Sequence, residues 1–299
     1  MKIGIALGGG GAKGVAHIGV LRVLEVARVK IDMVAGTSAG AIVGALYAAG
    51  KSLDEIEFVI RRLTLRQLLT RDRMGMGLFS TNGIRRVIER EIGAAARIED
   101  LPRAFAAVAV DMESGEEITL DKGSVADAVC ASAAFPGLFS PVQVGERLYF
   151  DGGVMNPVPF DVLRRRGADL VLAVDLGADD PVFTVAPARH RRGDLFYRLL
   201  FVAGNRKIMR VAARAIGVMS KQMRLQKLRQ SPPDVVIYPN VQAIGLMDFD
   251  MADECITAGE NAARNRLSQI HQALARPRWH YESRKLIERI RRELEARSA

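Results

Sequence analysis

The stretch that decides the fold is Lys2-Ile3-Gly4-Ile5-Ala6-Leu7-Gly8-Gly9-Gly10-Gly11-Ala12-Lys13-Gly14, at the start of the chain. Its apolar part ends at glycine and is too short for a helix, so it predicts a buried strand. Apolar residues at helical spacing follow from Val15 to Val26. A strand, a glycine turn and a helix in this order indicate an α/β protein.

The same order of elements continues along the chain. Further strands are predicted at residues 33–35, 105–110, 118–120, 148–150, 170–174 and 235–238. Helices are predicted at residues 39–49, 52–63, 124–134, 161–166 and 251–274, with long basic helices before residue 230. Residues 71–83, rich in Gly, Met, Ser and Thr, are predicted to form a mobile loop. Strands that alternate with helices predict a mostly parallel sheet covered on both faces, with ligands at the carboxyl ends of its strands.

Composition excludes several classes of protein. Of 299 residues, 49% are hydrophobic and 26% charged, which excludes disordered, collagen-like and coiled-coil chains. Two cysteines exclude a disulfide-stapled scaffold and fit a reducing compartment. No apolar run reaches the ~18–20 residues of a transmembrane helix, and the apolar run at the start is too short for a signal peptide. We therefore expect a cytoplasmic protein that is at most peripheral on a membrane.

The positive charge is concentrated in two segments. Of the net charge of +9, residues 188–230 hold 12 Lys and Arg against one Asp, and residues 276–299 hold 8 against 4 Glu. Such segments suit anionic lipid head groups or nucleic acid equally on charge alone, and a solvated helix face is the third interpretation. Without interleaved aromatic residues we expect no nucleic-acid partner.

The first glycine turn resembles a nucleotide-binding loop only in part. Gly9, Gly11 and Gly14 match the dinucleotide-binding pattern G-x-G-x-x-G. A dinucleotide-binding protein would also have an acidic residue at the end of the second strand, but the only candidate, Asp32, lies at the start of that strand. The phosphate-loop pattern also fails, because Lys13 precedes the last glycine. A nucleotide-binding oxidoreductase therefore stays an alternative, tested by a thermal shift with NAD(P).

The second turn, Gly36-Thr37-Ser38-Ala39-Gly40, is a G-x-S-x-G between a strand and a helix. This context is typical of a nucleophile elbow, in which small neighbours expose the serine hydroxyl above the sheet edge. An incidental serine in a glycine-rich turn is the other interpretation. We favour Ser38 as a nucleophile.

A serine nucleophile needs a base, and the histidines are poorly placed to act as one. His17 lies in the first helix and His271 in a periodic helical stretch, while His190 and His280 lie in basic segments. A third turn, Asp151-Gly152-Gly153, follows a strand and offers a carboxylate instead. The competing interpretation is a turn aspartate that binds its own backbone.

Together, the three turns resemble the patatin-like phospholipase family in their order. The resemblance includes the segments 131–137 and 151–159, covers about residues 3–175, and extends loosely over 232–274. It implies a three-layer α/β/α fold, with one hydrolase domain over residues 1–275 and a basic amphipathic tail over 276–299.

The resemblance also implies a chemistry. It implies a Ser–Asp dyad, with Ser38 attacking an acyl ester and Asp151 as base, and no metal or other cofactor. The backbone N–H groups of Gly9, Gly10 and Gly11 would form the oxyanion hole. Supporting motif residues are Lys13, Gly14, Gly36, Gly40, Gly152 and Gly153. A catalytically silent lipid- or membrane-binding protein on the same fold is the alternative.

Several apolar side chains gain a role from this interpretation. Those in the loop (Met74, Met76, Leu78 and Phe79) would gate an acyl groove. Those on the basic helix (Met209, Met219 and Met223) would line it, touch a bilayer or pack in the core. A basic helix with apolar residues 195–201 suits either an anionic membrane surface or packing within the domain. The tail would dock on the domain, on a partner subunit or on a membrane. Oligomeric state is left open.

Overall fold

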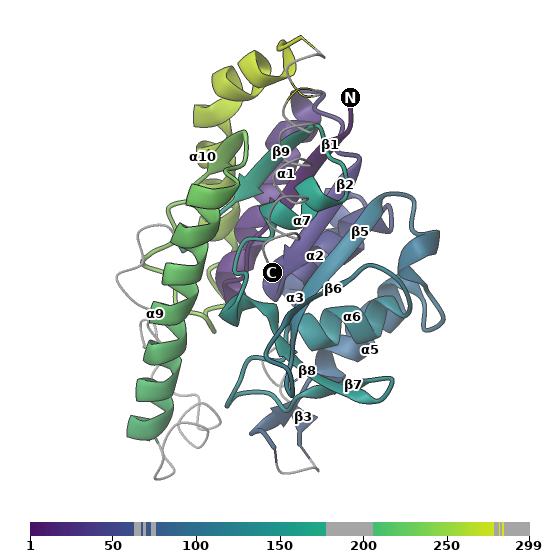
Figure 1. The fold of residues 1–299 in the computed structure, drawn as a ribbon, viewed down its shortest axis with the longest axis vertical. Helices are drawn as coiled ribbons and strands as arrows, with labels where there is room; N and C mark the ends of the chain where they lie inside the picture. The colour runs from purple at the N-terminus through teal and green to yellow at the C-terminus, as the bar shows by residue number, and fades with distance from the viewer. Residues whose placement is uncertain are drawn as a thin grey trace, which may run out of the picture.

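The computed structural model describes residues 1–62, 67, 70–72, 76–177, 206–277, 281 and 283 (Figure 1). The strands are β1 (Ile3–Leu7), β2 (Met33–Thr37), β3 (Thr70–Arg71), β4 (Phe79–Ser80), β5 (Ala104–Asp111), β6 (Glu117–Leu120), β7 (Val142–Val144), β8 (Arg147–Asp151), β9 (Leu170–Val174) and β10 (Val235–Ile237). The α-helices are α1 (Ala16–Val26), α2 (Ala39–Ala48), α3 (Leu53–Arg62), α5 (Asn82–Ile92), α6 (Val125–Ser132), α7 (Phe160–Arg165), α9 (Arg206–Gln230) and α10 (Ala252–Leu274). Short 3₁₀ helices are η1 (Gly11–Val15), η2 (Ile98–Asp100) and η3 (Gly152–Val154).

The main sheet has the strand order β10-β9-β1-β2-β5-β8-β7, with β6 also paired to β5. The pairs from β10 to β5 are parallel, whereas β6, β7 and β8 join by antiparallel pairing. The predicted mostly parallel sheet is confirmed, and it has an antiparallel end.

Side chains of the central strands alternate between two apolar cores, because successive residues of a strand point to opposite faces. Ile5 and Leu7 pack in the larger core with α1, α2, α6 and α10, and Ala6 packs in the smaller core with α7 and the end of α9. Both faces of the sheet are therefore covered by helices, which confirms the three-layer α/β/α architecture.

The way β2, β6 and β8 pair with β5 determines where the site lies. β6 pairs with residues 107–110 along one edge of β5. The other edge carries β2 as far as Thr37, opposite Val108, and then β8 from Asp151, opposite Ala109. β2 and β8 run toward each other, so their carboxyl ends meet at consecutive residues of β5.

The loop expected at 71–83 is the main correction. β4 lies within it, and α5 begins at Asn82. Ile84, Val87 and Ile88 are buried at helical spacing, a signal that the Gly- and Ser-rich context concealed. Strand β7 was also missed, because a strand of three residues has too few positions to show alternation.

Other expectations are confirmed or fall outside the description. The strands predicted at 105–110 and 118–120 are β5 and β6, which form a hairpin around residues 114–115. The Ser124 hydroxyl caps α6 by accepting a 3.2 Å hydrogen bond from the N–H of Asp127. The predictions for residues 188–205 and for most of the tail after 277 lie outside the described residues.

Candidate active site

Ser38 stands between β2 and α2 with a strained backbone. Its φ of 54° lies in the region that favours glycine. The turn closes only with small neighbours, because a Cβ on Gly36 would lie 2.4 Å from the carbonyl oxygen of Gly40 and one on Gly40 would lie 2.0 Å from that of Leu7. This is the local geometry expected of a nucleophile elbow.

The backbone N–H of Ser38 is held from another element. It donates a 3.0 Å hydrogen bond to the side-chain oxygen of Ser132, which is fully buried at the end of α6. Ala134, two residues further along the chain, is the partner of Asp151. Its carbonyl oxygen accepts a 3.0 Å hydrogen bond from the backbone N–H of Asp151. The end of α6 therefore supports both candidate residues.

Asp151 is the last residue of β8 and is 2% exposed. Its Oδ1 accepts a 2.7 Å hydrogen bond from the N–H of Gly153, and its carboxylate is also hydrogen-bonded to the side chain of Ser38. Burial raises the pKa of Asp151 to about 6, although both hydrogen bonds lower it. Gly152 is required here because a Cβ would lie 2.2 Å from the carbonyl oxygen of Val108.

The glycine loop after β1 lies against the elbow. A Cβ on Gly9 would come within 3.3 Å of the Ser38 Cβ, and one on Gly11, whose φ is +57°, within 2.4 Å of the Leu246 carbonyl oxygen. The N–H of Gly9 donates to the carbonyl of Pro157 at 3.0 Å. Within the described residues, the N–H groups of Gly10 and Gly11 donate to no acceptor. The family resemblance places the N–H of Gly9 in the oxyanion hole, but in the structure that N–H already donates to Pro157.

Two further residues of the first motif, Lys13 and Gly14, are closely packed. Gly14 lets the start of the first helix touch the second, because a Cβ there would lie 2.5 Å from that of Ala39. The side chain of Lys13 is buried, at 4% exposure, rather than presented to solvent.

Of the two histidines that the structure describes, His17 supports the glycine loop. His17, fully buried on α1, places its Nε2 2.8 Å from the carbonyl oxygen of Gly8. Burial lowers the pKa of His17 to about 4, so the ring is neutral and donates through Nε2. His271 is exposed on α10, and His190 and His280 lie outside the described residues.

A polar network lies behind the dyad. The Thr37 hydroxyl donates to the Asn156 carbonyl at 2.8 Å, and the Asn156 amide donates to Asp161 at 2.8 Å. Lys227 on α9 lies 2.8 Å from both Asp161 and Glu117. This network joins α9 to the loop that follows Asp151.

Sequence reasoning missed Ser132 and Ser220 as contributors. The Ser220 hydroxyl donates a 2.6 Å hydrogen bond to the carbonyl of Gly153, next to the Asp151 turn. Ser132 lies within the segment 131–137 that carried the family resemblance, but no local pattern indicates its partner. Ser220 had no signal, because its contact depends on how α9 packs.

The expected acyl gate is described in part. Met76 and Leu78 are exposed, whereas Phe79 is 9% exposed and exchanges backbone hydrogen bonds with the segment 138–140. Phe79 is therefore a packed residue. Met74 and the side chain of Met209 lie outside the described residues, Met219 is exposed, and Met223 is half-buried.

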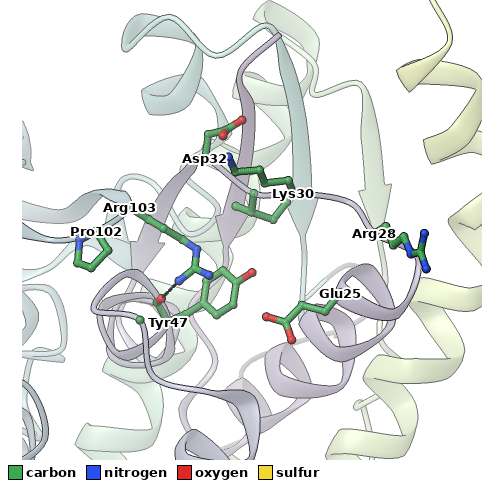
Figure 2. A pocket seen from close by; sticks show the side chains of 9 residues that line it. Glu25, Arg28, Lys30, Asp32, Tyr47, Pro102 and Arg103 are labelled. Carbon is green, nitrogen blue, oxygen red and sulfur yellow. Dashed lines mark hydrogen bonds between the residues drawn. The ribbon is translucent and has the colours of Figure 1, made fainter.

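A separate cavity of about 570 Å³ lies at the other end of the sheet (Figure 2). Its lining includes Asp32, immediately before β2, and Arg103, immediately before β5. Arg103 stacks on the ring of Tyr47, 4.3 Å from its centroid. This cavity therefore lies at the amino ends of β2 and β5, whereas Ser38 follows the carboxyl end of β2.

The described residues include neither a membrane-spanning helix nor a cluster of metal ligands. None of their helices combines the length and hydropathy needed to span a bilayer. In the same part of the chain, no three His, Cys, Asp or Glu side chains are grouped so as to hold a metal ion.

The described geometry agrees with a known family. The family model for patatin-like phospholipase matches residues 5–164, which include all three glycine turns. The chain belongs to the patatin-like phospholipase family. Among patatin-like structures, that of VipD from Legionella pneumophila is similar with a TM-score of 0.56 and 14% identity, covering 91% of this chain and 67% of that one. At this identity the likeness concerns the fold.

Relatives in sequence include larger proteins. The uncharacterized NTE family protein Rv2565 of Mycobacterium tuberculosis is 33% identical over 274 residues, which covers 88% of this chain and 46% of the relative. Mouse patatin-like phospholipase domain-containing protein 6 is 30% identical over 269 residues, which covers 86% of this chain and 20% of the relative. The chain thus spans less than half the length of these relatives.

Proposed function

We propose that this patatin-like chain is a lipid acyl hydrolase that cleaves acyl esters of phospholipids or related lipids through Ser38 and Asp151. The observation that carries the proposal is the hydrogen bond between the Ser38 side chain, on a strained elbow, and a buried carboxylate. With a pKa of about 6, Asp151 is largely ionised at neutral pH and able to accept a proton. Family membership supports the same substrate class.

In the first half-reaction, Ser38 Oγ attacks the ester carbonyl carbon while its proton passes to the Asp151 carboxylate. The negative oxygen of the tetrahedral intermediate accepts hydrogen bonds from the N–H groups of Gly10 and Gly11. When the carbon–oxygen bond to the alcohol breaks, Asp151 returns the proton to the departing oxygen. An acyl-enzyme on Ser38 remains.

In the second half-reaction, water replaces the alcohol. Asp151 takes a proton from the water as its oxygen attacks the acyl carbon, and the bond to Ser38 breaks as that proton passes to Oγ. The products are a free fatty acid and the regenerated dyad. Each oxyanion donor of this kind contributes on the order of 10²–10³ in rate.

The test is labelling with a fluorophosphonate, read by intact mass, beside hydrolysis of a panel of acyl esters. Wild type should gain one adduct, and Ser38→Ala should gain none. Asp151→Asn should lose ester hydrolysis while remaining folded. Ser114→Ala, in an exposed hairpin turn, is the matched control and should label like wild type.

Two results would count against the proposal. Wild-type turnover by either dyad variant would remove that residue from the mechanism. A folded wild-type protein that neither labels nor hydrolyses any ester would favour the catalytically silent lipid-binding alternative. Peripheral contact with an anionic membrane is the further expectation for a lipid substrate, and it is tested separately below.

A further inference from the structure

The carboxyl-terminal half of α9 contacts the domain through one face, which we call the inner face. Ser220 binds the Gly153 carbonyl, and Arg224 forms a buried 2.8 Å ion pair with Asp175. Lys227 adds its two ion pairs one turn further along. These contacts fix the rotation of the helix about its axis.

The opposite face of α9 combines apolar side chains with cations. Val211, Val218 and Met219 are 68%, 48% and 55% exposed. Arg214 and Lys221 are exposed beside them. These five residues form what we call the outer face, and their spacing places them on one side of an α-helix. Exposed apolar residues that gather in this way mark an interaction surface.

The charge of the helix narrows the choice of partner. α9 holds eight Lys and Arg and no Asp or Glu. Arg224 and Lys227 are matched by acidic residues of the domain, whereas Arg214 and Lys221 form no ion pair within the part of the chain that is described. A second copy of the chain would present the same cations on this face, and the like charges would repel each other. A nucleic acid would pair with the cations but would leave the apolar side chains without an apolar surface to bind. An anionic bilayer surface accepts both kinds of side chain.

The location also suits a lipid surface. Figure 1 shows the amino-terminal half of α9 extending past the carboxyl ends of β1 and β2, toward the end of the molecule that carries β3. The exposed Met76 and Leu78 come shortly after β3. Ser38 follows the carboxyl end of β2, so the outer face and the nucleophile belong to the same end of the molecule.

We propose that the outer face of α9 docks on a bilayer that contains anionic phospholipid, an inference that rests on the proposed lipid hydrolase function. The apolar side chains enter the boundary between head groups and acyl chains, and the cations contact the phosphate groups. Docking through this face brings the carboxyl ends of the parallel strands, where Ser38 lies, to the lipid surface.

The experiment is co-sedimentation of the full chain with vesicles of phosphatidylcholine alone or mixed with phosphatidylglycerol. All proteins carry Ser38→Ala, so that binding is measured without turnover. One variant adds Arg214→Glu and Lys221→Glu, and a second adds Val218→Ser and Met219→Ser. The matched control reverses two cations on α10, the exposed Arg264 and the half-buried Arg266, as Arg264→Glu and Arg266→Glu.

We expect binding to the mixed vesicles to exceed binding to pure phosphatidylcholine and to weaken with salt. Each α9 variant should bind roughly tenfold more weakly than the control variant. With Ser38 restored, the α9 variants should hydrolyse a soluble short-chain ester like wild type. That readout separates failure of docking from failure of the hydrolase proposal.

Three outcomes would overturn the docking proposal. The first is that the parent protein does not bind anionic vesicles. The second is that the α9 variants sediment with vesicles as much as the control does, and the third is that a second copy covers the outer face. The last outcome would appear as a dimer in light scattering that the Val218→Ser and Met219→Ser variant dissociates.

Discussion

The side-chain oxygen of Ser132 accepts a 3.0 Å hydrogen bond from the backbone N–H of Ser38. This bond joins the end of α6 to the strained residue of the elbow, and it holds the backbone of Ser38 at a φ of 54°. A backbone in this region persists only when its surroundings over-determine it.

Ser132→Ala should therefore lower reactivity at Ser38 without removing the nucleophile. We expect the rate of fluorophosphonate labelling and kcat to fall roughly tenfold or more, because the part-buried N–H of Ser38 loses its acceptor and the elbow loosens. Ser124→Ala, which removes the cap of the same helix, is the control. It should cost about 1 kcal/mol of unfolding free energy and leave labelling unchanged. Equal labelling of Ser132→Ala and wild type would remove the positioning role.

The pH dependence of hydrolysis should follow Asp151. A base must be ionised to act, and burial raises the pKa of Asp151 to about 6. Therefore kcat/KM should rise as pH increases through about 6 and level off above it, since this ratio reports the free enzyme. The measurement is kcat/KM on a soluble ester from acid to neutral pH. A profile that is already level well below pH 6 would contradict the assignment.

Ionised, buried Asp151 should also lower the free energy of unfolding at neutral pH. Its folded-state pKa is about 6, above the ordinary 3.8, so the folded protein binds more protons than the unfolded chain between these values. Stability contributed by this group is therefore lost as pH rises through that window. Asp151→Asn should raise the free energy of unfolding at pH 7 by up to about 3 kcal/mol, and the gain should vanish below about pH 4. Denaturant titrations of both proteins across this range test the sign, and a gain that persists at low pH would refute it.

His17 should matter through the carbonyl of Gly8. Replacing it by Phe leaves that buried oxygen without its donor, which should cost about 1–3 kcal/mol of unfolding free energy and lower kcat by disturbing the glycine loop. Gln, which keeps a donor, should restore part of both losses. His271→Phe, at an exposed site on α10, serves as the comparison. If His17→Phe kept full stability and full turnover, the hydrogen bond would be dispensable.

Short-range constraints explain what could be predicted from the chain alone. Gly36, Ser38 and Gly40 are neighbours, and the steric limits on a tight strand-to-helix turn apply whatever surrounds it. The alternation of strands and helices predicted the layers for a similar reason. The family resemblance added the pairing of Ser38 with Asp151, which no local pattern required.

Tertiary packing decided the rest of the site. Asp151 reaches Ser38 because β8 and β2 meet end to end along one edge of β5, and strand pairing between distant segments leaves no trace in local periodicity. The same holds for Ser132 and Ser220, whose partners are backbone groups on other elements. Gly9 shows the limit most clearly. As a glycine in the loop it was an equal candidate donor, and only the fold turned its N–H to Pro157. A residue's type restricts which hydrogen bonds it forms, but the direction in which its backbone points is set by everything packed around it.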